Sequence, residues 1–492
     1  MSYETEVLII GGGIAGTAIA RELSRYRADV TLVEKGVDFG QEISKSSSTI
    51  VKQGSNVLEF RPEYHNSRLV WAGMTLIEPL CEELDVPLKK IGSLMPVKNR
   101  EGMRHPGKML RRFGEWKGHH LPEVEPLQFI DKETLRKWEP NLNMDFIGAV
   151  YDPNISVIDP VRLTIALAEN AAENGINIML ETEVKDIKKE IDYFEVQTNR
   201  GTMKCRYIIN AAGEYVVKIA QMVDADDFAL YPLKSYKGVL DKKVGDLINH
   251  MVFTNENGTV NPTVYGNLFF GISPGSQRLG KIHDHSTDKK MADAALKHAQ
   301  ELVPAISEKD IINSWVGFIM FRNFEVGWHE CSVGVSRWVP GFINASIGFP
   351  GICAAPAVAK EMVDILSQEG MLLEEDPGFD PYRKAPPVFN ELLEEQKKEL
   401  IEKNPLYGRV ICRCETVTEG EIVEAIRRGA RSMDGVKFRC RPGMGRCQGG
   451  FCGPRVAGIL SRELGIPLNE VTKKGGHSSY VKYKSKELLG GK

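Results

Sequence analysis

The sequence predicts a mixed α/β fold: a Rossmann-like domain interrupted by an inserted antiparallel α+β domain and followed by a small α-rich module. Three observations predict it. A glycine-rich turn near the N-terminus lies between an apolar run and a helical pattern. Residues 228–285 are rich in Val, Phe, Tyr and Gly, with short alternating runs, and five of the nine cysteines lie within residues 412–452. A chain of 492 residues is also too long for one hydrophobic core, so several domains are expected.

The N-terminal segment has the order strand, turn, helix, strand. An apolar run meets the turn Gly11–Gly16, a helical pattern follows, and a second apolar run ends in Glu34. Gly11 allows a sharp turn, Gly13 lets the backbone approach a pyrophosphate, and Gly16 lets helix and strand pack closely. The unpaired N–H groups of the helix N-terminus favour an anion, and Glu34 is placed to accept hydrogen bonds from a ribose diol. The segment therefore predicts a dinucleotide site.

Two later segments repeat the pattern of a strand that ends in a small-residue turn. Residues 201–213 form an expected strand closing on Ala-Ala-Gly. Residues 341–356 combine a strand, a Gly/Pro turn and a helix that continues to Ile365. Such turns bring the backbone close to a ligand, and the second one again offers a helix N-terminus. Further helices are expected over residues 66–85 and 159–174.

Three polar stretches carry weaker signals. Residues 43–54 supply hydroxyl and N–H groups that suit a cofactor phosphate, or they form a solvated loop, and composition leaves both interpretations open. Residues 100–125 are basic, and we interpret them as a solvated excursion rather than a site. Residues 374–408, which are acidic and then rich in Pro, Glu and Lys, are interpreted as a boundary region.

Composition argues against two classes of partner. With 42% hydrophobic residues, 26% charged residues and a net charge of −3, the chain indicates neither nucleic-acid binding nor general attraction to membranes. No window approaches the roughly 18 consecutive apolar residues of a membrane span. The first strand pattern begins almost at once, so we expect no signal peptide and a cytoplasmic location. Four scattered cysteines are expected to be buried thiols: Cys81, Cys205, Cys331 and Cys353.

The C-terminal cysteines have the spacing of a metal centre. Cys412 and Cys414 flank one residue, so both thiolates can face one centre, and Cys447 and Cys452 return on a glycine-rich loop. Four thiolates suit either a [2Fe–2S] cluster or structural zinc. The spacing is not the common zinc-finger one, which favours the cluster.

Four motifs together resemble the FAD-dependent oxidoreductases of the D-amino-acid oxidase and glycerol-3-phosphate dehydrogenase group. They are Gly11–Gly16 with Glu34, residues 182–184 (Thr-Glu-Val), residues 209–213 (Ile-Asn-Ala-Ala-Gly) and Gly348–Gly351. The resemblance covers roughly residues 5–385 and implies FAD rather than NAD. The residues that it implies at FAD are Gly11, Gly13, Ile14, Ala15, Gly16, Glu34, Lys35, Ser44, Lys45, Ser48, Thr49, Val184, Ala212, Gly213, Gly348, Phe349, Gly351 and Ile352.

The same resemblance implies where several of these residues lie. Ser44, Lys45 and Ser48 are expected at the FAD diphosphate, and Val184 is expected at the adenine. Residues 348–352 are expected to present N–H groups and a helix terminus to the flavin pyrimidine, stabilising negative charge on the reduced flavin.

The C-terminal module resembles the bacterioferritin-associated-ferredoxin-like [2Fe–2S] domain, through Ile411–Glu421 and Gly443–Pro454. Thr418 and Glu421 form a capping box for an expected helix through Arg428. The resemblance implies cluster ligands at Cys412, Cys414, Cys447 and Cys452. Cys440 falls where the family pattern has no ligand, so it is interpreted as a bystander or spare thiol. Flavin and cluster on one chain resemble the catalytic subunit of anaerobic glycerol-3-phosphate dehydrogenases, and flavin–cluster subunits of opine and proline dehydrogenases share this layout.

The substrate side departs from the family pattern. Residues 260–267 look like the family's PTxxGN motif, but Lys52 stands where related enzymes tend to carry histidine. Ile319 stands at about the place of their substrate-binding arginine. Lys52 is either a catalytic lysine, if burial depresses its pKa, or a surface residue. The candidate catalytic residues are Lys52, Arg322, Tyr265 and Tyr236.

The expected domains follow from these motifs. Residues 1–385 form the FAD-dependent oxidoreductase, and residues 386–408 a linker. Residues 409–475 form the [2Fe–2S] domain, and residues 476–492 a mobile tail. Within the oxidoreductase, the FAD-binding parts are expected at about 1–80, 150–220 and 325–370, with the substrate domain at about 81–149 and 221–324.

The combined parts predict an FAD-dependent dehydrogenase of a small hydroxy compound, with glycerol 3-phosphate as the leading candidate. The alternatives are oxidation of a C–N bond in an amino acid or opine, and an electron-transfer subunit without a substrate of its own. The expected partners are a small-molecule substrate and an electron-accepting subunit or quinone-linked protein, which could place the chain at the inner membrane. The sequence leaves the oligomeric state open.

Overall fold

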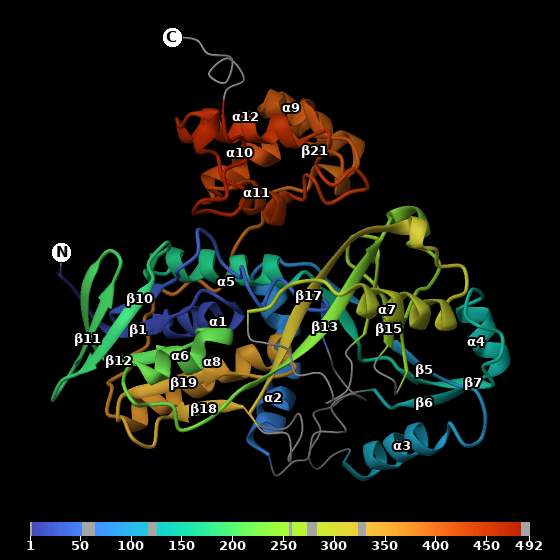
Figure 1. Ribbon diagram of the computed structural model, residues 1–492, viewed down its shortest axis with the longest axis horizontal. Helices are drawn as coiled ribbons and strands as arrows, with labels where there is room; N and C mark the ends of the chain where they lie inside the picture. The colour runs from blue at the N-terminus through green and yellow to red at the C-terminus, as the bar shows by residue number, and fades with distance from the viewer. Residues whose placement is uncertain are drawn as a thin grey trace. The chain divides into compact units, whose positions relative to one another are not determined.

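The computed structural model describes residues 2–51, 64–116, 125–254, 258–272, 283–322 and 331–483 (Figure 1). The chain forms two compact units. The large unit holds residues 1–33, 40–179 and 183–383, and the small unit holds residues 34–39, 180–182 and 384–492. The expected FAD-binding and substrate parts of the oxidoreductase fall in the large unit except for residues 34–39, 180–182 and 384–385, and the limits between the two parts stay a prediction. Lys52 and residues 484–492 of the expected tail lie outside the described residues.

The first sheet of the large unit is Rossmann-like. Its order is β10-β11-β12-β1-β2-β9, and β19 pairs with both β12 and β18. The parallel strands are β1 (Ser2–Ile10), β2 (Val30–Val33), β9 (Asn177–Met179), β12 (Gly201–Asn210) and β19 (Phe342–Ser346). The antiparallel additions are β10 (Val184–Lys189), β11 (Phe194–Thr198) and β18 (Ser332–Val335). Residues 7–9 are fully buried, as expected for a strand covered on both faces.

Four helices pack around this sheet: α1 (Ile14–Leu23), α2 (His65–Glu83), α5 (Pro160–Glu173) and α8 (Gly351–Gln368). Asp159 accepts hydrogen bonds from the N–H groups of Val161 and Arg162, which confirms the expected helix start. The helices α2 and α8 pack against each other, and a Cβ at Gly73 would lie 1.8 Å from the carbonyl oxygen of Cys353. Only glycine permits that approach.

The second sheet has the order β17-β13-β16-β15-β14-β5-β7-β6. All neighbouring pairs are antiparallel except β14 and β5, and the strands within residues 228–285 pair antiparallel with one another, as expected. The strands are β5 (Ser93–Val97), β6 (Gln128–Asp131), β7 (Gly148–Asp152), β13 (Tyr231–Leu240), β14 (Met251–Phe253), β15 (Gly258–Pro262), β16 (Leu268–Ile272) and β17 (Ile311–Phe321).

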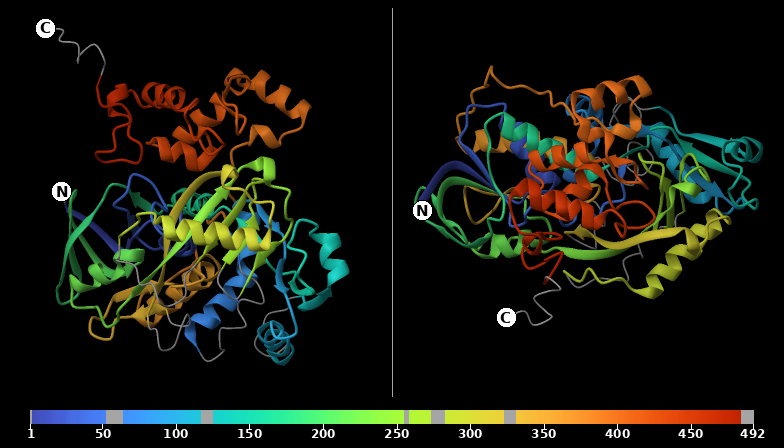
Figure 2. Two further views of the ribbon diagram at one scale, coloured as in Figure 1. Left: turned by 45° about the vertical axis from the view of Figure 1, so that its right-hand side comes forward. Right: turned by 90° about the horizontal axis from the view of Figure 1, so that it is seen from above.

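Helix α7 (Lys289–Leu302) crosses one face of this sheet, against β13, β15 and β16, and α4 (Lys132–Trp138) packs on β7 (Figures 1 and 2). Apolar residues of both helices join a core that includes Tyr236 and Phe270. The opposite face of the sheet is thereby left for a site. The remaining elements of the large unit are α3 (Arg104–Trp116), α6 (Val216–Gln221), β3 (Ile50–Val51), β4 (Leu88–Lys90) and β8 (Ser156–Ile158).

The small unit is mainly helical. Its elements are α9 (Glu394–Lys403), β20 (Val410–Cys412), β21 (Val417–Thr418), α10 (Glu419–Arg427), α11 (Met433–Cys440) and α12 (Gly453–Leu464). The expected capping box is confirmed, because Thr418 and Glu421 each bond the other's backbone N–H through the side chain. The expected linker at 386–408 contains α9.

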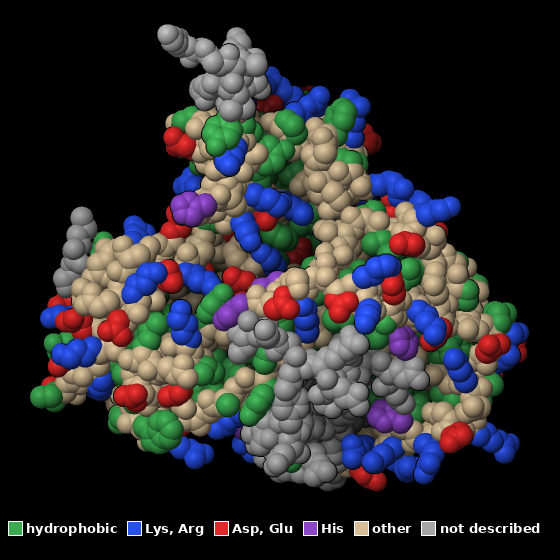
Figure 3. Space-filling view, viewed as in Figure 1, with side chains coloured by type: hydrophobic (Ala, Val, Ile, Leu, Met, Phe, Trp, Pro, Cys, Tyr) green, Lys and Arg blue, Asp and Glu red, His purple; other side chains and the backbone are tan. Residues whose placement is uncertain are grey.

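The face of the molecule seen in Figure 3 carries interspersed acidic and basic side chains over the large unit, in keeping with the balanced composition. Among the described residues, none of the helices combines the length and apolar character needed to cross a membrane.

Candidate active site

The large unit encloses a cavity of about 350 Å³ where strands of both sheets meet. The carboxyl ends of β1, β12 and β19 lead into it, through residues 13–15, 211–213 and 345–352. The opposite wall comes from β13, β16 and β17 of the second sheet. Ligands of open α/β sheets bind outside the carboxyl ends of the strands, so this is the expected place for a cofactor.

The glycine-rich turn is shaped by close backbone approaches. A Cβ at Gly16 would lie 1.9 Å from the carbonyl oxygen of Gly11, and a Cβ at Gly11 would lie 2.5 Å from that of Ala211. Gly11 also has a φ of +114°, which favours glycine. Neither glycine lines the cavity, so both act by bringing Gly13 to its wall.

Two helix N-termini open on the cavity. Helix α1 begins after Gly13 and α8 after Pro350, and neither N-cap residue supplies a capping side chain. The N–H of Ile14 donates to Ser44 Oγ at 3.0 Å, which brings the serine hydroxyl to the start of α1. Partial positive charge at two points of one cavity suits a diphosphate and a ring that gains negative charge on reduction. The donor set therefore fits FAD.

The structure places most of the expected FAD residues at this cavity. Those on its wall are Gly13, Ile14, Ala15, Ser44, Ser48, Gly213, Gly348, Phe349, Gly351 and Ile352. Those of the large unit away from the wall are Gly11, Gly16, Lys45, Thr49, Val184 and Ala212. Glu34 and Lys35 belong to the small unit, where Glu34 Oε1 accepts a hydrogen bond from the N–H of Gly36 at 2.6 Å. Their individual roles at FAD stay predictions.

Three of the expected catalytic side chains have structural contacts instead. Tyr236 is buried in the core of the second sheet, with its ring 6.2 Å from that of Phe270. Tyr265 donates its hydroxyl hydrogen bond to Asp159 at 2.9 Å, and Arg322 Nη1 donates to the carbonyl oxygen of Cys331 at 3.4 Å. None of the three lines the cavity, which argues against their expected catalytic roles.

Strand β13 instead contributes the neighbours of Tyr236. Ser235 and Lys237 line the cavity, because alternate side chains of a strand point to opposite faces. Lys237 Nζ donates to Ser235 Oγ at 2.8 Å. Ile319, at the place of the family's arginine, also lines the cavity. The sequence analysis selected Tyr236 on this strand, although the two-residue alternation of strand side chains could have identified Ser235 and Lys237.

Helix α3 contributes two further residues that the sequence analysis missed. His105 and Met109, four positions apart and so on one helix face, line the cavity, which corrects the interpretation of this stretch as a solvated excursion at these two residues; residues 117–124 lie outside the described residues. Thr254 lines it too, and its buried hydroxyl has no hydrogen-bond partner in the described part of the chain. A buried unpaired hydroxyl beside a cavity indicates a polar ligand.

The small unit brings the four expected cluster ligands together as two pairs. Cys412 and Cys452 are buried, and a hydrogen bond from Cys452 lowers the pKa of Cys412 to about 6 while raising that of Cys452. Cys414 and Cys447 are exposed, with their sulfurs 3.8 Å apart. Two thiolates on one tetrahedral metal, with bonds of about 2.3 Å, lie about 3.8 Å apart.

This pairing distinguishes one metal ion from two. A single tetrahedral zinc would hold four sulfurs at mutual distances of about 3.8 Å. Among the described residues, no three cysteine sulfurs lie within 4.8 Å of one another. Two separate pairs suit the two iron atoms of a [2Fe–2S] cluster. Cys440 is apart from them and donates to the carbonyl oxygen of Val436, within α11.

Comparison with known proteins agrees with both sites. Residues 6–365 match the family described as FAD dependent oxidoreductase. The chain belongs to this family. Residues 410–462 match the BFD-like [2Fe-2S] binding domain. The protein is thus an FAD-dependent oxidoreductase with two cofactors, FAD and a [2Fe–2S] cluster, as expected from the sequence, and the expected mixed α/β fold class is confirmed.

Three relatives of this FAD dependent oxidoreductase indicate how far the similarity extends. A glycerol 3-phosphate dehydrogenase of Caloramator mitchellensis is 38% identical over 97% of this chain and 98% of its own. One subunit of the anaerobic glycerol-3-phosphate dehydrogenase of Haemophilus influenzae is 22% identical over 96% of this chain and 87% of its own. The structure of the L-alpha-glycerophosphate oxidase of Mycoplasma pneumoniae, with FAD bound, has a TM-score of 0.70 and 26% identity. It covers 78% of this chain and 100% of that one.

Proposed function

We propose that the protein is a glycerol-3-phosphate dehydrogenase, which oxidises the secondary hydroxyl of glycerol 3-phosphate and yields dihydroxyacetone phosphate. The observation that carries the proposal is the similarity to the Caloramator mitchellensis dehydrogenase, which spans both the oxidoreductase and the cluster domain. When bound, FAD accepts the hydride, and the cluster passes the two electrons on one at a time. An oxidase would need no cluster for this step.

The wall of the cavity that the second sheet forms suits a phosphorylated polyol as the substrate. Lys237 supplies a positive charge, and Ser235, Thr254 and Thr259 supply hydroxyl groups. We propose that Lys237 takes the place of the family's arginine in binding the phosphate, since Ile319 at that position carries no charge. Its ammonium group already approaches Ser235 Oγ, so both side chains are positioned to donate to one anion.

The proton of the substrate hydroxyl needs an acceptor at the same wall. His105 lines the cavity and is the titratable imidazole that the described residues offer there, so we propose it as the general base. Lys52 remains the second candidate. The N-terminus of α8 favours the negative charge that the oxidation leaves in the cavity.

The exposed pair of cysteines is the proposed exit for electrons. Beside Cys447, the ring of Phe451 is 54% exposed and lies under the guanidinium groups of Arg413 and Arg455, at 5.1 and 5.4 Å. An exposed aromatic ring flanked by two cations suits a partner with an acidic surface. We propose an electron-accepting partner subunit, which would link the protein to a quinone at the membrane.

Anaerobic turnover with an artificial electron acceptor tests the substrate. The protein should convert glycerol 3-phosphate to a ketone that is identified as dihydroxyacetone phosphate by mass, while glycerol should react far more slowly because it lacks the phosphate. A ketone from glycerol 3-phosphate at no more than the glycerol rate would reject the proposal. Turnover of amino acids or opines instead would favour C–N oxidation, and no turnover of either class would favour an electron-transfer subunit.

Reversing the charge of Arg413 and Arg455 tests whether electrons leave beside the exposed pair of cysteines. The double variant Arg413→Glu/Arg455→Glu should keep turnover with a small artificial acceptor and lose most of the electron transfer to an acidic acceptor protein. The double variant Lys398→Glu/Lys403→Glu, with both residues in α9, is the charge-matched control and should keep both. Equal rates of electron transfer to the acidic protein in the arginine double variant and in the control would reject this exit for electrons.

A further inference from the structure

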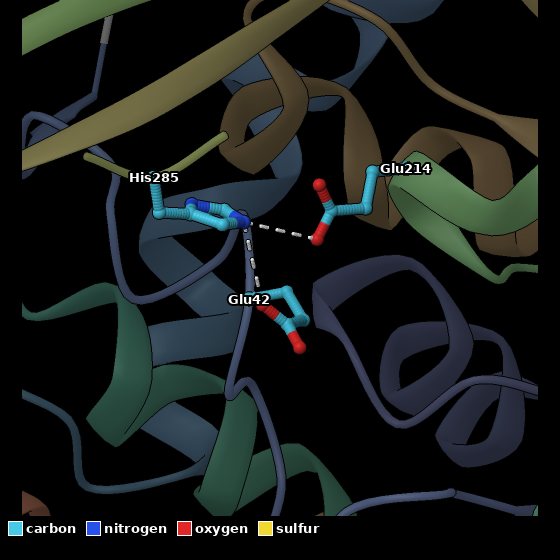
Figure 4. A group of neighbouring side chains, drawn as sticks. All are labelled: Glu42, Glu214 and His285. Atoms are coloured by element: carbon cyan, nitrogen blue, oxygen red, sulfur yellow. Dashed lines mark ion pairs between the residues drawn. The ribbon is translucent and has the colours of Figure 1, made fainter. Parts of the chain in front are cut away.

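A group of metal-ligating side chains lies outside the cavity, in the large unit. Glu42 comes from the segment after β2, Glu214 from the turn after β12, and His285 from the segment before α7 (Figure 4). One ligand atom from each residue lies within 4.8 Å of the other two. Figure 4 shows the three side chains converging on one point from three different segments.

Glu214 is the unusual member of the group. Its side chain is 1% exposed, and within the described part of the chain neither carboxylate oxygen has a hydrogen-bond partner. The nearest cationic atoms are imidazole nitrogens, His285 Nε2 at 3.4 Å and His283 Nδ1 at 3.2 Å. Charge-assisted hydrogen bonds are shorter, about 2.7–2.9 Å. Leaving a carboxylate buried without such bonds is costly, so the arrangement calls for another partner.

The separation between His285 and Glu214 matches that between two ligands of one metal ion, and the separation between His285 and Glu42 is about 0.5 Å longer. Bonds of about 2.1 Å place neighbouring ligand atoms about 3.0–3.4 Å apart in octahedral and tetrahedral sites. His285 Nε2 lies 3.4 Å from Glu214 and 3.9 Å from Glu42 Oε2. Glu42 and His285 are each partly exposed, so water can complete the coordination sphere.

We propose that Glu42, Glu214 and His285 bind a divalent first-row metal ion, with Zn²⁺ as the favoured ion for one imidazole and two carboxylates. His283 acts as a positioning residue. Its Nδ1 faces the second oxygen of Glu214, and its ring stacks on Tyr215 with centroids 4.3 Å apart. Such a second contact orients a ligating carboxylate.

The ion would connect loops that form the FAD cavity. Glu42 directly precedes Ile43 and Ser44, and Glu214 directly follows Gly213, and all three of these neighbours line the cavity. His285 lies edge-on to Phe318, with centroids 5.0 Å apart, and Phe318 lines the cavity as well. The metal is therefore a structural tie between the diphosphate loops and the second sheet, and its binding should slow the loss of FAD.

Metal binding to the FAD-loaded protein tests the proposal. After brief chelator treatment that leaves the cluster absorbance intact, titration with ZnCl₂ should show one site by calorimetry and a higher unfolding temperature. His285→Ala and Glu42→Gln should each weaken this binding roughly 10- to 100-fold. His298→Ala in α7, whose imidazole faces Glu301 at 3.5 Å, is the matched control and should bind as the parent does.

Two outcomes would overturn the site. One is the absence of Zn²⁺ or Mn²⁺ binding at millimolar metal. The other is binding that His285→Ala and Glu42→Gln leave unchanged, which would assign the ion to the cysteines of the small unit. FAD release after dilution gives a second readout: added Zn²⁺ should slow it in the parent and in His298→Ala, and should not slow it in His285→Ala.

Discussion

The two walls of the cavity are built in different ways. The wall from the Rossmann-like sheet presents backbone: the turn after β1, the turn after β12 and the N-termini of α1 and α8. The opposite wall presents side chains, among them Lys237 and Ser235 from the second sheet and His105 from α3. The first wall suits a cofactor shared by a whole family, while the second is the wall that binds the substrate in the proposed function.

The largest expected effect breaks the backbone wall. Gly16→Ala should abolish FAD binding, because its Cβ would lie 1.9 Å from the carbonyl oxygen of Gly11. The measurement is the ratio of FAD to protein in the purified variant. Gly114→Ala in α3 is the control, since a Cβ there has open space, and it should keep FAD and gain about 0.5–1 kcal/mol of helix stability. FAD retained in Gly16→Ala would contradict the tight-turn account.

A second change tests the side-chain wall alone. Lys237→Met should lower kcat/KM for glycerol 3-phosphate about 10- to 100-fold, the value of one hydrogen bond to a charged group, and keep FAD. Lys237→Arg should restore part of the loss. Lys234, on the same strand, is the control, because it pairs with Asp284 at 3.1 Å and does not line the cavity. An equal loss in Lys234→Met would refute the assignment of Lys237.

The contrast between the walls explains what the sequence could predict. The glycine turn, the helix starts and the capping box follow local rules of backbone geometry, and residues 13–15, 348, 349, 351 and 352, which were expected at FAD, line the cavity. The substrate wall depends on which face of β13 points inward and on where α3 packs. Tyr236 was a candidate catalytic residue, yet the alternation of side chains along β13 places it in the core. His105 came from a stretch whose charge suggested plain solvation.

The small unit allows a third comparison, between the four thiols of the expected cluster and Cys440, which lies outside that set. Cys447→Ser should bleach the cluster absorbance while FAD stays bound, because it removes one member of the exposed pair. Cys440→Ser, whose thiol bonds within α11, should leave the spectrum unchanged. Reduction of FAD by substrate should survive both changes, and electron transfer beyond it should fail only in Cys447→Ser. A cluster that persists in Cys447→Ser would reject this ligand.

The smallest expected effect is a pH-dependent change in stability that comes from His65, at the start of α2. Hydrogen bonds to Cys331 and Glu361 raise the pKa of His65 to about 10. A raised pKa stabilises the folded state below the unfolded value of about 6.5, and this contribution is lost as pH rises to about 10. His65→Gln should therefore lower the unfolding temperature by a few degrees at pH 6 and progressively less toward pH 10. A gap between the two proteins that widens with pH would contradict this sign.

Anaerobic titration of the purified protein with glycerol 3-phosphate tests the central proposal most directly. The flavin absorption band should disappear first, and partial bleaching of the cluster should follow as electrons reach it. In Lys237→Met the same end point should require more substrate. A flavin that stays oxidised at saturating glycerol 3-phosphate, while dithionite reduces it fully, would contradict the proposed activity.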